Sequence, residues 1–201
     1  MADVLIIAAH PHLEHSRVNQ ALMHAAGQLG GPRVDVRDLY ALYPDYLIDV
    51  DAEQDSLSKA KLIVWQHPIH WYSMPALMKL WIDDVLAFGW AYGPRGTALK
   101  DKDLWLVAST GDPEDSYRPN RYNRYFFDAF LAPYEQSAAL CGMRFVPPLV
   151  LHGAHRASRA EVDAHAKLYE SRLLSYPDWP ELAEMEPVEE CAVPADARPE
   201  S

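Results

Sequence analysis

The chain has 201 residues and a hydrophobic content of 49%, which is enough for one domain with a substantial core. Its formal net charge of −11 indicates that nucleic acid is not a partner. The segment 177–201 contains eight acidic residues and a single basic residue, Arg198. Two cysteines, Cys141 and Cys191, exclude a disulfide framework and a CxxC zinc site, and no apolar run approaches the ~18–20 residues of a membrane-spanning helix.

Strand and helix patterns alternate along the first half of the chain. The continuous apolar run 4–9 is typical of a strand that is buried on both faces of a parallel sheet. A serine can cap a helix over 16–29, and residues 33–37 then alternate apolar and polar side chains, as a half-exposed edge strand does. The polar segment 51–60 predicts a short helix, which a buried strand over 62–66 follows.

The same alternation continues in the second half. A proline opens a helix over 75–85 that keeps its apolar residues on one side, and an apolar run predicts a strand over 104–108. A helix is expected over 125–140. The strand expected over 145–152 contains two consecutive prolines, which only a sheet edge or a bulge tolerates. A capping-box pattern opens the last helix, over 158–174.

This order of elements predicts an α/β fold with parallel strands and right-handed crossovers. The two weak strands, the second and the fifth, suit the edges of a five-stranded sheet of order 2-1-3-4-5. We therefore expect a flavodoxin-like three-layer α/β/α sandwich over residues 1–176. The acidic, proline-rich segment 177–201 is expected to be a disordered tail.

Three loops follow strands one, three and four and should meet at the carboxyl edge of the sheet, where such folds bind phosphate-bearing ligands. The first offers His10, Ser16 and Asn19, and the second, 67–75, offers Trp71 and Tyr72 for contact with a planar heterocycle. The third is 109–112. Other interpretations remain open: Ser16 can be only a helix cap, Asn19 a surface residue, and Trp71 and Tyr72 core aromatics.

A metal site is the best rival chemistry. The sequence Ala9-His10-Pro11 is similar to the start of zinc-dependent deacetylases, in which adjacent acidic residues supply a metal ligand and a base. Here His12 and Leu13 stand in their place, so a metal-dependent deacetylase stays a remote alternative, and His12 and His15 are expected to face solvent. No GxSxG motif supports a hydrolase nucleophile.

Several motifs between residue 4 and about residue 175 resemble the NAD(P)H:quinone oxidoreductase family of flavodoxin-like flavoproteins. Within that family, they are most similar to the bacterial ancillary proteins of glutathione-regulated potassium efflux. The motifs are the opening Ile-Ile-Ala-Ala-His-Pro, Leu39-Tyr-x-Leu-Tyr-Pro-Asp45, the stretch from Ala60 to Pro75, Lys79-Leu-Trp-Ile-Asp83, Gly89-Trp-Ala-Tyr-Gly93, Gly96-Thr-Ala-Leu99, Cys141-Gly142 and Pro147-Pro148.

The resemblance implies a flavin site, for FMN or alternatively FAD, that extends over all three loops. Its phosphate and ribityl part would involve His10, Ser16, Arg17, Val18 and Asn19. Its isoalloxazine would lie along Pro68, Ile69, His70, Trp71 and Tyr72, and its other edge along Ser109, Thr110, Gly111 and Asp112.

Catalytic roles near the flavin are implied for Tyr117 and Trp71. The chain departs from the family at Asp112, where a glycine is common, and a histidine expected near Asn123 and Arg124 is missing. A carboxylate at Asp112 would disfavour negative charge on a reduced flavin.

The expected activity is that of an FMN-dependent NAD(P)H:quinone oxidoreductase, which transfers hydride from NADPH or NADH to a quinone-like acceptor by a ping-pong mechanism. The expected location is the cytoplasm. The alternative is a regulatory ancillary subunit of a membrane potassium-efflux protein at the inner membrane, and both roles can coexist.

The aromatic segment from Trp81 to Tyr92 suggests a homodimer in which Trp90 or Tyr92 of a second subunit reaches the site. Trp81 itself is expected in the core or at the interface.

Overall fold

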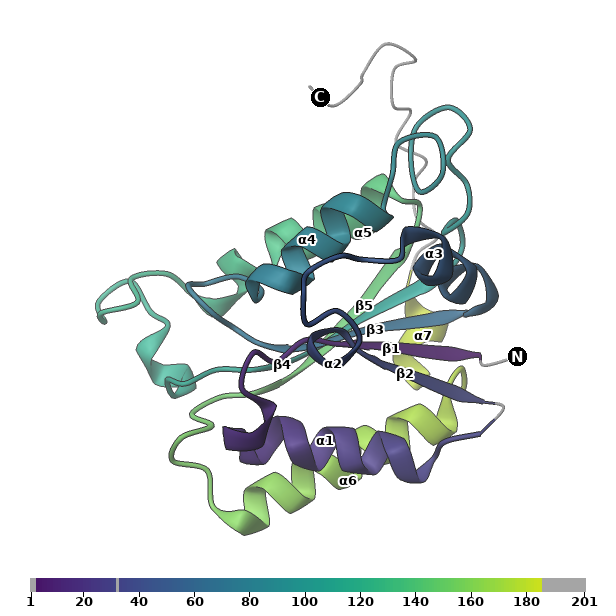
Figure 1. The fold of residues 1–201 in the computed structure, drawn as a ribbon. Coiled ribbons are helices and arrows are strands. Elements are labelled where there is room, and N and C mark those ends of the chain that lie inside the picture. The colour runs from purple at the N-terminus through teal and green to yellow at the C-terminus, as the bar shows by residue number, and fades with distance from the viewer. Residues whose placement is uncertain (1–2, 32, 186–201) are drawn as a thin grey trace.

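The computed structural model describes residues 3–31 and 33–185, and its centre is a parallel sheet of five strands (Figure 1). The strands are β1 (Val4–Ala8), β2 (Val34–Asp38), β3 (Leu62–Pro68), β4 (Asp103–Ser109) and β5 (Arg144–Leu151). Their order is β2-β1-β3-β4-β5, so the predicted topology is confirmed. The three central strands are buried along their whole length, as their continuous apolar runs require.

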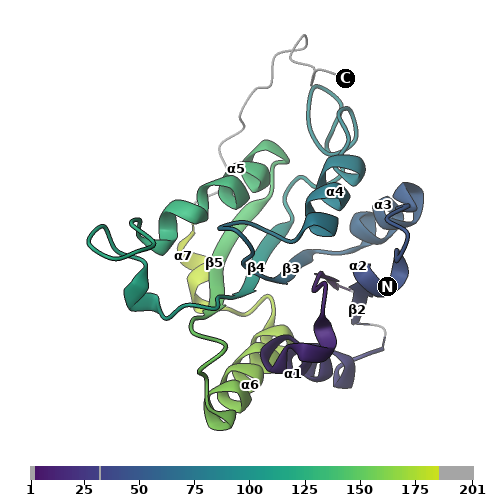
Figure 2. The same ribbon diagram turned by 60° about the vertical axis from the view of Figure 1, so that its left-hand side comes forward.

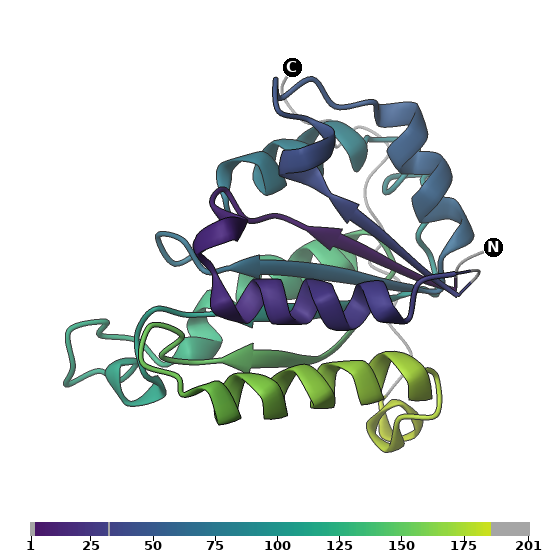
Figure 3. The same ribbon diagram turned by 60° about the horizontal axis from the view of Figure 1, so that its bottom comes forward.

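Helices cover both faces of the sheet, and each face has its own core. Leu5 and Ile7 point to one face, where α2 (Leu39–Leu42), α3 (Val50–Lys59), α4 (Ala76–Val85) and α5 (Ala132–Leu140) pack. Val4 and Ile6 point to the other face, which α1 (Arg17–Gln28), α6 (Arg159–Ser175) and the short α7 (Pro180–Glu184) cover. Figure 3 shows α1 and α6 side by side across this second face. Short 3-10 helices lie at Leu13–His15, Glu114–Ser116 and Phe127–Phe130.

A buried carboxylate connects the edge strand β2 to the core on the face that α2 to α5 cover. Glu53 of α3 is fully buried, and its carboxylate accepts hydrogen bonds from Arg37 Nε at 2.7 Å, the Tyr43 hydroxyl at 2.5 Å and Trp81 Nε1 at 3.0 Å. The charge of Glu53 is thus neutralised by Arg37, as burial of an ion requires. Trp81 is therefore a core residue of this chain and cannot form a dimer interface.

The edge strand β5 accommodates its two prolines by an irregular register. The pairing of β4 with β5 shifts between Trp105 and Val107, opposite Pro147 and Pro148. Trp105 Nε1 donates to the Pro147 carbonyl at 3.1 Å, so the indole satisfies an acceptor at this irregular point. The prolines therefore lie both in an edge strand and at a register irregularity, so the expectation of an edge or a bulge is confirmed.

Two expectations differ from the structure. The helix expected over 125–140 begins only at Ala132, because Pro133 suits the first turn of a helix but not its interior, and a 3-10 turn precedes it. The tail expected to be disordered from 177 is folded as far as 185: Trp179 is 3% exposed and Leu182 is 8% exposed against the second core. The rest of that tail, 186–201, lies outside the described residues. None of the helices over 3–31 and 33–185 is long and apolar enough to cross a membrane.

Candidate functional site

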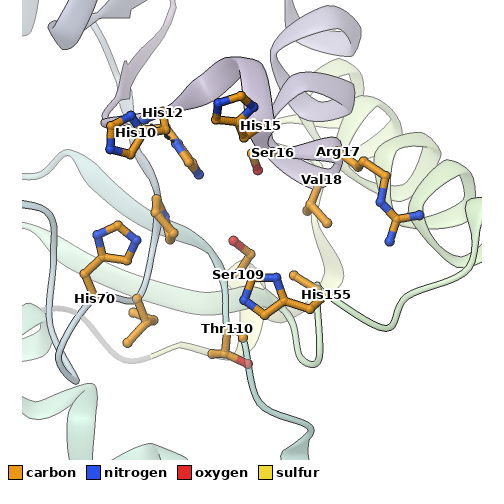
Figure 4. A pocket seen from close by; sticks show the side chains of 14 residues that line it. His10, His12, His15, Ser16, Arg17, Val18, His70, Ser109, Thr110 and His155 are labelled. Carbon is orange, nitrogen blue, oxygen red and sulfur yellow. Dashed lines mark hydrogen bonds between the residues drawn. The ribbon is translucent and has the colours of Figure 1, made fainter.

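A cavity of about 380 Å³ opens at the carboxyl edge of the sheet, where loops after β1, β3, β4 and β5 meet. Figure 4 shows its side chains converging from these loops. Its lining consists of His10, His12, His15, Ser16, Arg17, Val18, Pro68, Ile69, His70, Ser109, Thr110, Gly111, Ala154 and His155.

The start of α1 forms one wall of the cavity. The Ser16 hydroxyl accepts hydrogen bonds from Asn19 N at 3.2 Å and Asn19 Nδ2 at 3.1 Å, so it caps the helix and lines the cavity at once. Asn19 is 2% exposed, and its Nδ2 also donates to Ser109 Oγ at 3.0 Å, which joins the first and third loops. Asn19 is therefore no surface residue, and its side chain lies behind the lining.

Backbone amides supply hydrogen-bond donors at this wall. Among hydrogen bonds between described residues, Arg17 N and Val18 N have no acceptor, as is usual in the first turn of a helix. Arg17 lines the cavity, but its guanidinium donates to the Ala157 carbonyl at 2.9 Å and points away from the other labelled side chains (Figure 4). The free amides and the helix dipole make this wall suited to a phosphate group.

The second loop forms a tight turn beside the cavity. His70 and Ser73 exchange backbone hydrogen bonds of 2.9 and 3.0 Å, and the two residues between them have left-handed φ angles, 49° at Trp71 and 64° at Tyr72. Bulky side chains rarely adopt this conformation, which costs roughly 1–2 kcal/mol per residue. Trp71 is 93% exposed and Tyr72 is 46% exposed, so the core interpretation of these rings is wrong. Both lie next to the cavity and outside its lining.

The third loop closes the opposite side. Ile69 N donates to the Ser109 carbonyl at 2.8 Å, which holds the second and third loops together. Thr110 Oγ1 donates to the Asp112 carbonyl at 2.7 Å and lies 3.0 Å from His152 Nδ1. A Cβ added at Gly111 would lie 3.1 Å from the His155 ring, so a side chain at that position would crowd the ring.

Asp112 and Tyr117 lie outside the lining. Asn123 Nδ2 contacts the Asp112 carboxylate at 3.5 Å, and neither residue is part of the cavity lining. Tyr117 is 6% exposed and packs 5.7 Å from the His152 ring, and burial raises the pKa of its hydroxyl. The catalytic role expected for Tyr117 stays a prediction, and its position suits a residue that supports the loop.

Five histidines surround the cavity, of which the sequence interpretation included His10 and His70 alone. The His10 and His70 rings meet edge to face at 6.3 Å, and burial, followed by their histidine neighbours, lowers the pKa of both. His12 and His15 border the cavity although their side chains are 72% and 80% exposed, so they do face solvent as expected. His155, with Ala154, comes from the loop after β5 and was missed.

Of the fourteen cofactor-binding residues expected, ten line the cavity, and Asn19, Trp71, Tyr72 and Asp112 do not. The strand order could have indicated the missed residues Ala154 and His155, because the loop after β5 also lies at the carboxyl edge of the sheet. Within the described ranges, no group of three or more histidine, cysteine or acidic side chains is arranged to hold a metal ion.

Comparisons with known proteins agree with this geometry. A family model described as a flavodoxin-like fold matches residues 2–173. The chain belongs to the flavodoxin-like family. It is 45% identical over 173 residues to the glutathione-regulated potassium-efflux system ancillary protein KefF of Citrobacter koseri, covering 86% of this chain and 96% of the relative. The KefF of Salmonella newport is 44% identical over the same length.

Solved flavodoxin-like structures are similar as well. General stress protein 14 of Treponema denticola, solved in complex with FMN, is 38% identical with a TM-score of 0.81, covering 86% of this chain and 98% of the other. An NADPH-quinone reductase from P. pentosaceus is 27% identical with a TM-score of 0.75, covering 85% and 96%. The resemblance to the NAD(P)H:quinone oxidoreductase family is thereby confirmed.

Proposed function

We propose that this chain is an FMN-dependent NAD(P)H:quinone oxidoreductase. The observation that carries the proposal is the cavity at the carboxyl edge of the sheet, with a free helix N-terminus at one wall and the loops after β3, β4 and β5 along the others. The similar protein from Treponema denticola is described with FMN, and the one from P. pentosaceus is described as an NADPH-quinone reductase. Bound flavin supplies two-electron redox chemistry between the nicotinamide and the quinone.

The start of α1 fits the phosphate of FMN. Two amides, Arg17 N and Val18 N, are free to donate, and the Ser16 hydroxyl can donate while its oxygen caps the helix. Ser109, which Asn19 holds at 3.0 Å, would orient the ribityl arm from the other side. The start of α1 is the one α-helix N-terminus among the lining residues, which favours the single phosphate of FMN over the pyrophosphate of FAD.

The loops after β3 and β4 would hold the flavin ring between backbone and small side chains. Ile69, His70, Thr110 and Gly111 face the cavity, and the Ile69–Ser109 backbone bond fixes the spacing of these loops. Gly111 N and Asp112 N have no acceptor among hydrogen bonds between described residues, so they are available to polar atoms of the ring. Trp71, exposed beside this slot, would contact the nicotinamide or the acceptor.

Tyr117 and Asp112 lie outside the cavity lining and would act on the site through neighbouring groups. The pKa of Tyr117 is raised by burial, so its hydroxyl stays protonated at neutral pH and can keep the third loop in place. The Asp112 carboxylate, held by Asn123, would disfavour negative charge at this edge of the site. We assign both the role of positioning residues.

Homodimer formation and an ancillary role toward a membrane potassium-efflux protein are also proposed. The identity of 45% to KefF over 86% of this chain favours the second role. A protein with this role would act in the cytoplasm and reach the inner membrane through its partner. Co-purification with a potassium-efflux protein, with and without FMN, tests the role directly.

The enzyme proposal is tested by reconstitution. Purified protein is incubated with FMN or FAD, desalted, and assayed for NADPH and NADH oxidation with a quinone acceptor. We expect a yellow protein that retains FMN and turns over. The variant Gly111→Val should lose FMN because its side chain meets His155, whereas Gly27→Ala, in open space on α1, should retain it. A wild-type protein that retains neither flavin contradicts the proposal.

A further inference from the structure

A basic and aromatic segment, residues 118–126, projects beyond the carboxyl edge of the sheet between the second and third 3-10 helices (Figures 1 and 2). We call it the arm. It folds as two successive turns, closed by bonds from Arg121 N to the Arg118 carbonyl at 3.0 Å and from Arg124 N to the Arg121 carbonyl at 3.1 Å. Each such turn brings its end residues within about 7 Å. The arm therefore gathers three arginines in a chain whose net charge is −11.

Two of these arginines carry charge that the described protein does not neutralise. Arg118 pairs with Asp115 at 2.8 Å. Arg121 and Arg124 are exposed, and neither makes a side-chain hydrogen bond or an ion pair with any residue in 3–31 or 33–185. No acidic residue occurs between 116 and 127. The arm thus presents free guanidinium groups at the end of the molecule that holds the cavity.

Exposed rings accompany these charges. Tyr122, Tyr125 and Phe126 are 67%, 62% and 60% exposed, which is unusual for three large aromatic side chains within five residues. Aromatic rings stack on nucleobases, and arginine recognises phosphate with two parallel hydrogen bonds. Together, these side chains offer contacts for both the base and a phosphate group of a nucleotide.

The arm is fixed to the segment before it and to the turn of the second loop. Asn123 is 5% exposed, and its Nδ2 donates to Ser116 Oγ at 2.8 Å, while its Oδ1 accepts from the Tyr72 hydroxyl at 3.3 Å. The Tyr72 ring also stacks on Phe130 at 5.1 Å. The arm is therefore joined to the turn that carries Trp71, which follows the cavity-lining His70, and the two form one wall.

We propose that Arg121 and Arg124 bind the 2′-phosphate of NADPH, with the exposed rings of the arm against its adenine, so that the arm selects NADPH over NADH. This inference rests on the proposed function. A flavin in the cavity leaves the mouth as the approach for the nicotinamide, and the remote end of the dinucleotide then extends along the wall that Tyr72 and Asn123 join. The selectivity comes from a charge-assisted contact that NADH lacks.

The kinetic test uses FMN-loaded wild type and the double variant Arg121→Gln/Arg124→Gln, at a fixed quinone concentration. Loss of a guanidinium–phosphate contact should raise KM for NADPH about tenfold and leave KM for NADH and both kcat values within about twofold. Arg95→Gln, which changes an exposed arginine of the loop between α4 and β4, is the matched control and should behave as wild type. KM values that stay unchanged, or that rise equally for the two co-substrates, overturn the proposal.

A binding measurement gives a second readout that needs no turnover. Adenosine 2′,5′-bisphosphate and adenosine 5′-monophosphate are titrated into FMN-loaded protein by calorimetry. We expect the bisphosphate to bind about tenfold more tightly to wild type and the difference to vanish in the double variant. Equal affinities in wild type contradict the inference. Wild type that binds the bisphosphate selectively but oxidises neither NADPH nor NADH contradicts the proposed function instead.

Discussion

His67 should make the stability of the protein depend on pH below neutrality. Its side chain is fully buried at the end of β3, directly before Pro68 and Ile69 of the cavity lining. Its Nδ1 lies 2.9 Å from the Pro68 carbonyl, its ring stacks on Tyr134 at 5.6 Å, and its Nε2 finds no partner within the described ranges. Burial is the main reason that the pKa of His67 falls from 6.5 to about 4.

The sign follows from proton binding. Between these two pKa values the unfolded chain holds a proton at His67 that the folded chain does not, so lower pH favours unfolding. The contribution to stability is complete above pH 6.5 and is lost as the pH falls toward 4. The fall of the His67 pKa from 6.5 to about 4 corresponds to about 3.4 kcal/mol, of which about 2.4 kcal/mol is lost between pH 7 and pH 4.5.

The assay is urea-induced unfolding at those two pH values, in flavin-free buffer, for wild type and His67→Asn. An asparagine amide can still donate to the Pro68 carbonyl but does not titrate, so the variant should lose about 2.4 kcal/mol less stability than wild type on acidification. Other buried histidines contribute equally in both proteins and cancel. His24→Asn, at an exposed position of α1, is the matched control. It should lose as much stability as wild type when the pH is lowered from 7 to 4.5. Identical pH dependence in wild type and His67→Asn refutes the reasoning.

Three further substitutions test separate parts of the structure. Ser16→Ala removes the acceptor of Asn19 N and should cost about 1 kcal/mol in urea unfolding and weaken FMN binding in a fluorescence titration; unchanged FMN affinity argues against a phosphate at this wall. Glu53→Gln leaves the charge of the partly buried Arg37 uncompensated and should cost about 3 kcal/mol, seen as a lower Tm; a stability equal to wild type means that the network is not neutralising charge. Trp71→Asn keeps a residue that tolerates positive φ, so stability should stay within about 0.5 kcal/mol while quinone turnover falls, and unchanged turnover removes Trp71 from the acceptor site.

Much of the fold follows from local sequence signals. The apolar runs at β1, β3 and β4 are long enough to identify buried parallel strands, and Ser16 and the Ser158–Glu161 capping box place two helix starts correctly. The helix expected from residue 125 begins only at Ala132, because Pro133 suits the first turn of a helix and not its interior. Helix α7 was missed because acidic composition outweighed Trp179, whose burial depends on its contact with Trp105 at 4.9 Å.

The site was predictable as far as topology determines it. Loops after β1, β3 and β4 meet at one edge in any sheet of this order, which is why His10, Ser16 and Ser109 could be named together. The inclusion of His155 depends on the path of the chain between β5 and α6, which no local pattern encodes. The exposure of Trp71 could not be inferred either, because it results from two consecutive left-handed residues that sequence statistics disfavour.

The prolines of β5 limit how copies of this protein can assemble. Pro147 and Pro148 have no N–H group to offer, and the strand that contains them forms the outer border of the sheet. A second molecule therefore cannot continue the sheet across that border by regular backbone pairing, and the border is protected against fibrous aggregation in the same way. Any assembly across the β5 border must therefore be built through helices and loops.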